Sequence, residues 1–160
     1  MAASAKPDAA LEARSIITTR VFDAPRALVF KAWSYPKHLA EWWGPTGFTT
    51  TTHRFEFQPG GVWRFVMHGP DGTDYQNLIT FDEIVKPEKL VYHHGGSVEG
   101  EPVQFDVTVA FEALGDKTRV TMHAVFPTAA ERNRVAEKYG AIEGAQQTLG
   151  RLALYLTAMR

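Results

Sequence analysis

Hydrophobic residues alternate with polar ones along most of the chain, and this period of two predicts β-strands. The clearest run covers residues 103–111, where valine and phenylalanine occupy every second position. A β-branched run at residues 14–22 predicts a first strand. The same reasoning predicts further strands at residues 53–57, 62–67, 75–85, 90–94 and 118–126. Because short turns separate the last six, we expect them to pair in antiparallel fashion.

Two short helices are predicted between the first and second strands. Pro25 and Pro36 each precede an apolar helical pattern, and proline is favoured at the first position of a helix, where its missing N–H costs no hydrogen bond. Gly44 and Pro45 end the second pattern.

The C-terminal segment predicts one long helix. Thr128 and Glu131 have the spacing of a capping box, and apolar residues then recur every three, four or seven positions. About 30 helical residues would span about 45 Å, enough to cross a whole sheet. Gly140, Gly144 and Gly150 would each cost about 1 kcal/mol relative to alanine. A bend, or close approach to the sheet, would explain why they are tolerated.

These elements predict an α+β fold. A curved antiparallel sheet of seven strands wraps around the long C-terminal helix, and the two short helices lie between strands one and two. We expect a single domain at residues 14–160, which fits a length of 160 residues. Residues 1–13 read as a disordered or loosely attached tail.

The composition removes several classes of function. A formal charge of −1 provides no long-range field for nucleic acid or an anionic membrane. The chain has no cysteine, and therefore no disulfide or sulfur-ligated zinc. No stretch predicts a signal peptide or a membrane span, so we expect a cytoplasmic protein. The aromatic content of 12% predicts a core or cavity rich in rings.

Several segments carry a family resemblance. They are FDAPRALVFKAW at 22–33, HLAEWWGP at 38–45, PGGVWRF at 59–65, GPDG at 69–72 and PEKLVY at 87–92. With the order of elements, they resemble the bacterial proteins named after the activator of heat-shock protein 90 ATPase. That group lies within the START-like superfamily, also called SRPBCC, helix-grip or Bet v-like. The resemblance covers roughly residues 14–158.

The resemblance implies a cavity between the sheet and the long helix. Across the superfamily such cavities hold apolar molecules, including lipids, hormones and polyketides. A few relatives are enzymes that steer polyketide cyclisation, and the eukaryotic namesake binds a chaperone. Because one fold hosts many functions, the residues of the site have to decide among these.

Large side chains on the predicted inner faces are the candidate ligand-binding residues. They either fill the gap between sheet and helix as core or line a ligand cavity. Tyr75 and His94 are the best polar candidates, because an inward hydroxyl or imidazole needs a partner. The whole set is Trp42, Trp63, Phe65, Met67, Tyr75, His94, Phe105, Val107, Met122 and Tyr139.

No metal, cofactor or catalytic constellation is predicted. His93 and His94 are adjacent on one predicted strand, so their side chains leave opposite faces and cannot share an ion. The remaining histidines have no ligand spacing. No serine lies in a nucleophile elbow.

Three functions remain open. The first is binding of a small apolar or aromatic ligand in the cavity. The second is a chaperone ATPase co-factor of the kind the family name describes. The third is a metal-free cavity enzyme of cyclase or hydrolase type, in which His94 or Tyr75 would act as acid or base. An exposed strand edge, or the end formed by Trp42 and Trp43, could support a homodimer.

Overall fold

The computed structural model describes residues 9–95 and 104–159. A single antiparallel sheet has the strand order β1-β7-β6-β5-β4-β3-β2. This confirms the predicted α+β, helix-grip architecture. The strands are β1 Ser15–Phe22, β2 Thr49–Phe55, β3 Val62–His68, β4 Asp74–Val85, β5 Lys89–His94, β6 Phe105–Leu114 and β7 Lys117–Val125.

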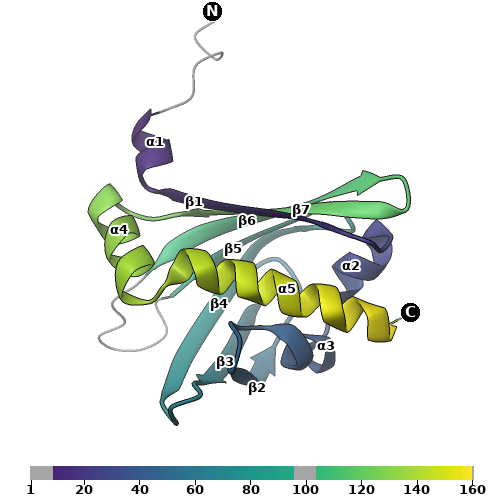
Figure 1. Cartoon of the computed structure of the whole chain (residues 1–160), viewed down its shortest axis with the longest axis horizontal. Helices are drawn as coiled ribbons and strands as arrows, with labels where there is room; N and C mark the ends of the chain where they lie inside the picture. The colour runs from purple at the N-terminus through teal and green to yellow at the C-terminus, as the bar shows by residue number, and fades with distance from the viewer. Residues whose placement is uncertain (1–8, 96–103, 160) are drawn as a thin grey trace, which may run out of the picture.

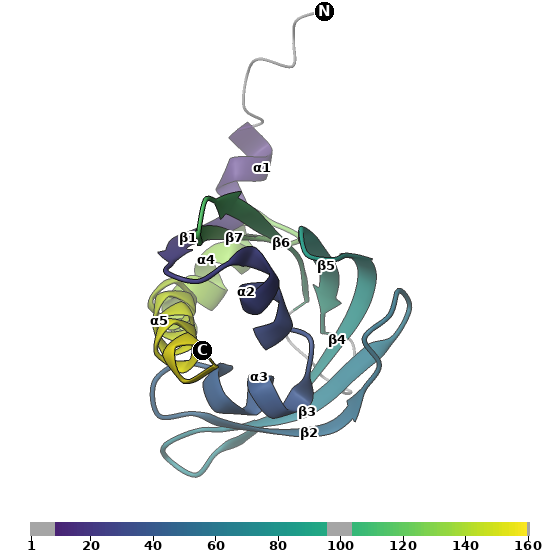
Figure 2. The same cartoon turned by 90° about the vertical axis from the view of Figure 1, so that its right-hand side faces the viewer.

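Helices α2, α3, α4 and α5 lie on the inner side of this curved sheet, whereas α1 projects from its edge beyond β1 (Figure 1, Figure 2). Figure 1 shows the last helix crossing the sheet, and Figure 2 shows it in the gap between the two ends of the arc of strands, near β1 and β2. Within the described residues, no helix combines the length and apolarity needed to cross a bilayer. The helices are α1 Ala9–Ala13, α2 Arg26–Ala32, α3 Pro36–Trp42, α4 Ala129–Lys138 and α5 Ala141–Met159.

The main hydrophobic core is rich in aromatic rings. It lies at the end of the molecule where α2 and α3 contact α5 and the sheet. Trp33 packs edge-on against Trp42, with ring centroids 4.8 Å apart, and against Phe111 at 5.7 Å. From the other side, α5 buries Leu149, Leu152 and Leu156. The apolar stripe that the sequence predicts for the C-terminal helix is therefore the face that contacts the core.

The C-terminal segment differs from the predicted single helix, because it breaks at Gly140. Thr128 caps α4 as expected, with its hydroxyl oxygen accepting from the Glu131 backbone N–H at 3.1 Å. Gly140 then adopts a φ of +60°, a left-handed conformation that glycine reaches without steric cost. The chain turns there into α5, which has 19 residues. The bend considered for the glycines is thus located at the first of them.

Smaller differences affect element ends. The second strand ends at Phe55, so Phe57 lies beyond it. Residue 103, the expected start of the sixth strand, and residues 1–8 of the expected tail lie outside the described residues. The described part of that tail forms α1, and the Ser15 hydroxyl donates to the carbonyl of Leu11 at 2.6 Å.

Candidate functional site

A cavity of about 760 Å³ lies between the inner face of the sheet and the α4–α5 segment. Its wall is mostly apolar, and several strands and both C-terminal helices contribute to it. The lining residues are Ile16, Thr18, Trp43, Gly44, Pro45, Phe48, Met67, Asp74, Tyr75, Gln76, Asn77, Tyr92, His94, Phe105, Val107, Met122, Ala124, Phe126, Val135, Lys138, Tyr139, Ala141, Gly144, Ala145 and Thr148.

Strand register builds the floor of the cavity. Ala124 on β7 pairs with Ile16 on one side and with Val107 on the other. Val107 in turn pairs with Tyr92 on β5. Laterally paired residues share a face of the sheet. The row across β1, β7, β6 and β5 therefore presents four side chains to the same cavity.

A histidine and an amide form the polar part of the wall. His94 Nε2 lies 2.8 Å from Oδ1 of Asn77 on the neighbouring strand β4. The Asn77 amide nitrogen donates to the carbonyl of Tyr75 at 2.9 Å, which leaves Oδ1 facing the imidazole. Because Oδ1 is an acceptor only, Nε2 carries the proton and donates. His94 Nδ1 is then an unprotonated acceptor.

Burial keeps this imidazole neutral. Desolvation, with a smaller contribution from neighbouring His93, lowers the pKa of His94 to about 4. The rings of Phe105 and Phe65 lie 4.8 Å and 6.4 Å from its ring. An apolar surrounding of this kind disfavours the charged form. His94 therefore offers a neutral polar group at neutral pH.

Tyr92 is a second polar side chain in the wall. Its side chain is 3% exposed, and its hydroxyl has no hydrogen-bond partner among the described residues. Burial raises the pKa of the Tyr92 hydroxyl, so the group stays protonated. Tyr92 and His94 are two residues apart on β5 and point to the same face of the sheet.

Exposed lining residues mark the opening of the cavity. Tyr75 near the start of β4 is 41% exposed, and Tyr139 at the end of α4 is 46% exposed. Lys138 lies over the Tyr139 ring, 5.4 Å from its centroid. The ring of Phe48 packs 6.1 Å from that of Tyr75. The cavity thus opens between the start of β4 and the junction of α4 with α5.

The loop that follows α3 forms another side of the wall, and α5 holds it in place. Arg151 Nη1 donates to the carbonyl oxygens of Gly44 at 2.9 Å and Pro45 at 3.2 Å. A Cβ on Gly144 would lie 3.5 Å from Pro45 Cγ, so the loop approaches α5 closely. This contact fixes one boundary of the cavity.

Seven of the ten predicted ligand-binding residues line this cavity, and three do not. Those that do are Met67, Tyr75, His94, Phe105, Val107, Met122 and Tyr139. His94 faces inward, whereas Tyr75 and Tyr139 lie at the opening.

The other three, Trp42, Trp63 and Phe65, lie in the solid core. The indole N–H of Trp42 donates to the carbonyl of Ala32 at 3.1 Å, which holds the side chain among the helices. Trp63 and Phe65 stack with ring centroids 3.9 Å apart. Trp43 covers both rings, at 4.9 Å from Trp63 and 6.2 Å from Phe65, and forms the cavity wall in their place.

Sequence reasoning missed Tyr92, Asn77 and Trp43. The period of two already placed Tyr92 on the same face as His94, so that signal was available. Asn77 and His94 are 17 positions apart and meet only through strand pairing. Trp43 and Trp42 are neighbours in the sequence, and only the end of α3 at Trp42 separates their environments.

His93 points to the opposite side of β5, as predicted for the neighbour of His94. Its ring nitrogens lie 2.9 Å from an Asp106 carboxylate oxygen and 3.1 Å from Gln104 Oε1. Burial lowers the pKa of His93, but these hydrogen bonds outweigh it and leave the pKa raised. The two adjacent histidines therefore differ in the direction of their pKa shifts and in the face of β5 to which their side chains point.

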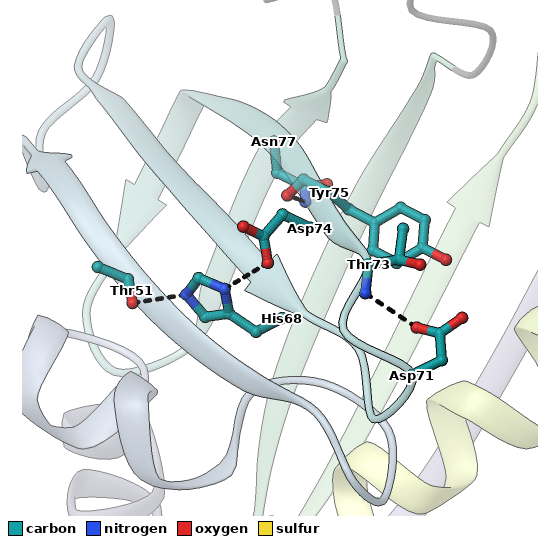
Figure 3. Close-up of polar contacts among 7 residues, drawn as sticks. All are labelled: Thr51, His68, Asp71, Thr73, Asp74, Tyr75 and Asn77. Atoms are coloured by element: carbon teal, nitrogen blue, oxygen red, sulfur yellow. Dashed lines mark hydrogen bonds and ion pairs between the residues drawn. The ribbon is translucent and has the colours of Figure 1, made fainter.

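A hydroxyl, an imidazole and a carboxylate line up at the other end of the sheet. His68 Nδ1 lies 2.7 Å from Asp74 Oδ1, and its Nε2 lies 2.8 Å from the Thr51 hydroxyl (Figure 3). The order is that of a nucleophile, base and orienting acid. Thr51 and Asp74 are both exposed, and Thr51 lies in neither described pocket. Because the Thr51 hydroxyl faces solvent and not a pocket, we interpret these contacts as cross-strand hydrogen bonds on the surface formed by β2, β3 and β4.

Within the described residues, no group of three or more His, Asp or Glu side chains could hold a metal ion. The site consists of an apolar wall with a few neutral polar groups inside and the exposed side chains of Asp74 and Lys138 at its opening. Such a site can bind and orient a small molecule.

Comparison with known proteins agrees with this architecture. The family model described as "Activator of Hsp90 ATPase homolog 1-like protein" matches residues 23–157. No curated protein matches the chain.

Two solved structures illustrate the similarity. A protein from Arthrobacter aurescens is 29% identical, with a TM-score of 0.85 over 94% of this chain and 90% of that one. A protein from Mycobacterium smegmatis is 25% identical, with a TM-score of 0.84 over 97% of each chain.

Proposed function

We propose that this chain, which belongs to the activator of Hsp90 ATPase homolog 1-like family, binds a small apolar or aromatic molecule in the cavity between the sheet and the C-terminal helices. The observation that carries the proposal is the cavity itself, with a volume of about 760 Å³. Small-molecule sites typically enclose about 300–1,000 Å³, with apolar walls and a few placed polar groups.

Small side chains leave this space unfilled. The aromatic core ends at Trp43, and beyond it α5 faces the sheet with Ala141, Gly144 and Ala145. Ala124 occupies the middle of the floor. Protein interiors are normally packed as densely as crystals of small organic molecules. A cavity of this size that no side chain fills therefore supports a binding role.

A bulky side chain on α5 tests the proposal directly. Nile red, a neutral apolar dye, should bind the wild-type protein with increased fluorescence. Ala145→Trp should abolish this increase, because the indole would occupy the cavity from α5. Ala158→Trp places the same residue at an exposed position of the same helix and should bind as the wild type does. Equal dye binding by both variants, or none by the wild type, would reject the proposal.

The natural ligand can be sought with the same protein. Native mass spectrometry of freshly purified material should show a co-purified small molecule, which Ala145→Trp should lose. The spectrum also measures the stoichiometry and so tests whether the protein forms a homodimer.

The family description favours a second candidate, a chaperone co-factor. Capture of a purified Hsp90-type chaperone by the wild-type protein, equally by Ala145→Trp, would support that role independently of the cavity. The third candidate, a metal-free cavity enzyme, requires turnover of a bound compound that depends on His94. Binding without turnover would leave the carrier role.

A further inference from the structure

Two polar atoms of the cavity wall, close together on β5, have no hydrogen-bond partner among the described residues. Among the described residues, the fully buried side-chain polar atoms without a hydrogen bond are Trp33 Nε1 and His38 Nε2, both outside the cavity wall. The Tyr92 hydroxyl and His94 Nδ1 also lack partners but belong to lining residues. They therefore contact the cavity space, where a ligand can reach them.

The two atoms have complementary roles. Asn77 Oδ1 accepts a hydrogen bond from the protonated Nε2 of His94, so in the neutral imidazole Nδ1 can only accept. The phenolic hydroxyl of Tyr92 can donate. An inward polar group in an apolar wall costs free energy unless a partner satisfies it. A hydroxyl on the ligand would satisfy Nδ1 by donating to it, and its oxygen, or a nearby one, would accept from Tyr92.

The remaining polar lining residues do not compete for this role. Asp74, Gln76 and Lys138 are exposed at the opening. Tyr75 and Tyr139 are likewise exposed at the opening. The Thr148 hydroxyl donates to the carbonyl of Gly144 within its own helix at 2.8 Å. The Thr18 hydroxyl is buried and also has no hydrogen bond among the described residues, but Thr18 lies on β1, three strands from β5, which corresponds to about 14 Å across the sheet.

We infer that the cavity selects neutral, hydroxyl-bearing apolar molecules, with His94 Nδ1 accepting from the ligand hydroxyl and Tyr92 donating to a ligand oxygen. This inference rests on the proposed binding function and names its ligand class. A carboxylate would meet a neutral acceptor at His94 and would lose its hydration in an apolar wall, so anions should be rejected.

Four naphthalene compounds separate these contributions when each displaces Nile red. 2-Naphthol can donate and accept, 2-methoxynaphthalene can only accept, naphthalene can do neither, and 2-naphthoate is an anion. For the wild-type protein we expect 2-naphthol to bind roughly tenfold more tightly than naphthalene. 2-Methoxynaphthalene should lie between them, and 2-naphthoate should bind least.

Matched variants assign the preference to residues. His94→Phe should lower the affinity of 2-naphthol to that of 2-methoxynaphthalene, because only the bond from Tyr92 to the ligand oxygen remains. His93→Phe changes the adjacent residue on the opposite face and should keep the preference. Tyr92→Phe should remove the advantage of 2-methoxynaphthalene over naphthalene. Thermal unfolding of each variant establishes that it is folded.

A measurement on the wild-type protein covers the case in which His94→Phe does not fold. The imidazole ¹⁵N resonance of His94 Nδ1 should shift on titration with 2-naphthol and stay in place with naphthalene. Equal affinities for 2-naphthol and naphthalene, an unshifted resonance, or tightest binding by 2-naphthoate would overturn the inference while leaving Nile red binding intact. Loss of the dye signal itself would instead reject the proposed function.

Discussion

Nη1 of Arg151 lies 2.9 Å from the carbonyl oxygen of Gly44, which connects the middle of α5 to the loop after α3. Gly44 lies two residues beyond the end of α3 at Trp42. The same guanidinium nitrogen also donates to the carbonyl of Pro45 at 3.2 Å. The contact therefore holds the loop after α3 against α5 and positions the cavity wall at Pro45.

Removing this guanidinium should destabilise the protein and loosen the cavity wall. Hydrogen bonds to charged groups contribute about 1.5–3 kcal/mol when buried, and this one is only partly buried, so Arg151→Met should lower the free energy of unfolding by about 1–2 kcal/mol. Urea titration measures the change. Arg119→Met, which removes the exposed pair with Glu112, is the control and should cost less than about 0.5 kcal/mol. Equal losses for the two variants would contradict the assigned role.

The stability of the protein should fall in mild acid because of His94. Its pKa is about 4 in the folded protein, against about 6.5 in an unfolded chain. Between these values the unfolded state binds more protons, so the free energy of unfolding decreases as the pH falls. The contribution is complete above about pH 6.5, and about 3 kcal/mol should be lost by pH 4.

Urea unfolding of the wild type and His94→Phe at pH 7.5, 5.5 and 4.5 isolates this contribution. Burial also lowers the pKa of His38, whereas His93 has a raised pKa, and both remain in the variant. The difference in stability between the two proteins should therefore shift in favour of the variant as the pH falls. A difference that stays constant with pH would show that His94 is not buried in neutral form.

The hydroxyl of Tyr155 lies 2.6 Å from His38 Nδ1, while His38 Nε2 is buried without a partner in the described part of the chain. Tyr155→Phe would leave both ring nitrogens unsatisfied, and we expect a loss of about 1–2 kcal/mol in unfolding free energy. In a His38→Leu background the same change should cost much less, since the partner is already gone. A double-mutant cycle by urea unfolding measures this coupling. Additive effects would mean that the contact contributes nothing.

Two glycines of the C-terminal segment should respond in opposite directions to alanine. Gly140 has a φ of +60°, so Gly140→Ala should destabilise the protein by about 1–2 kcal/mol. Gly150 lies inside α5, and an added Cβ would meet only the end of the Arg20 side chain at 3.7 Å. Gly150→Ala should therefore stabilise by up to about 1 kcal/mol. Thermal unfolding compares them, and a shift of the same sign in both would refute the assigned bend.

The sequence predicted best those features that depend on residues close together in the chain. Alternation along single strands depends on neighbouring residues, so it located the seven strands and placed His93 and His94 on opposite faces of one strand. The end of β2 at Phe55 and the break at Gly140 were less visible. In both places the apolar pattern continues past the point where the backbone changes direction.

No pattern along the chain distinguished inward residues that fill the core from inward residues that line the cavity. Trp63 and Met67 share a face of β3, yet Trp63 lies in the solid core and Met67 lines the cavity. The difference comes from what lies opposite each one. Trp63 meets the indole of Trp43, whereas the space before Met67 extends toward the small residues of α5.

By itself, the sequence determined the fold class, the order of the strands along the chain and which residues of a strand share a face. These follow from periodicity and turn residues, which act over a few positions. The sequence left open whether Tyr75 and His94 point inward. Only the tertiary structure decided where the interior is filled, which atoms of Tyr92 and His94 stay unpaired and which helix residue holds the loop at Gly44. Those outcomes depend on side chains brought together from distant strands and helices, and their distances are set by packing of the whole domain.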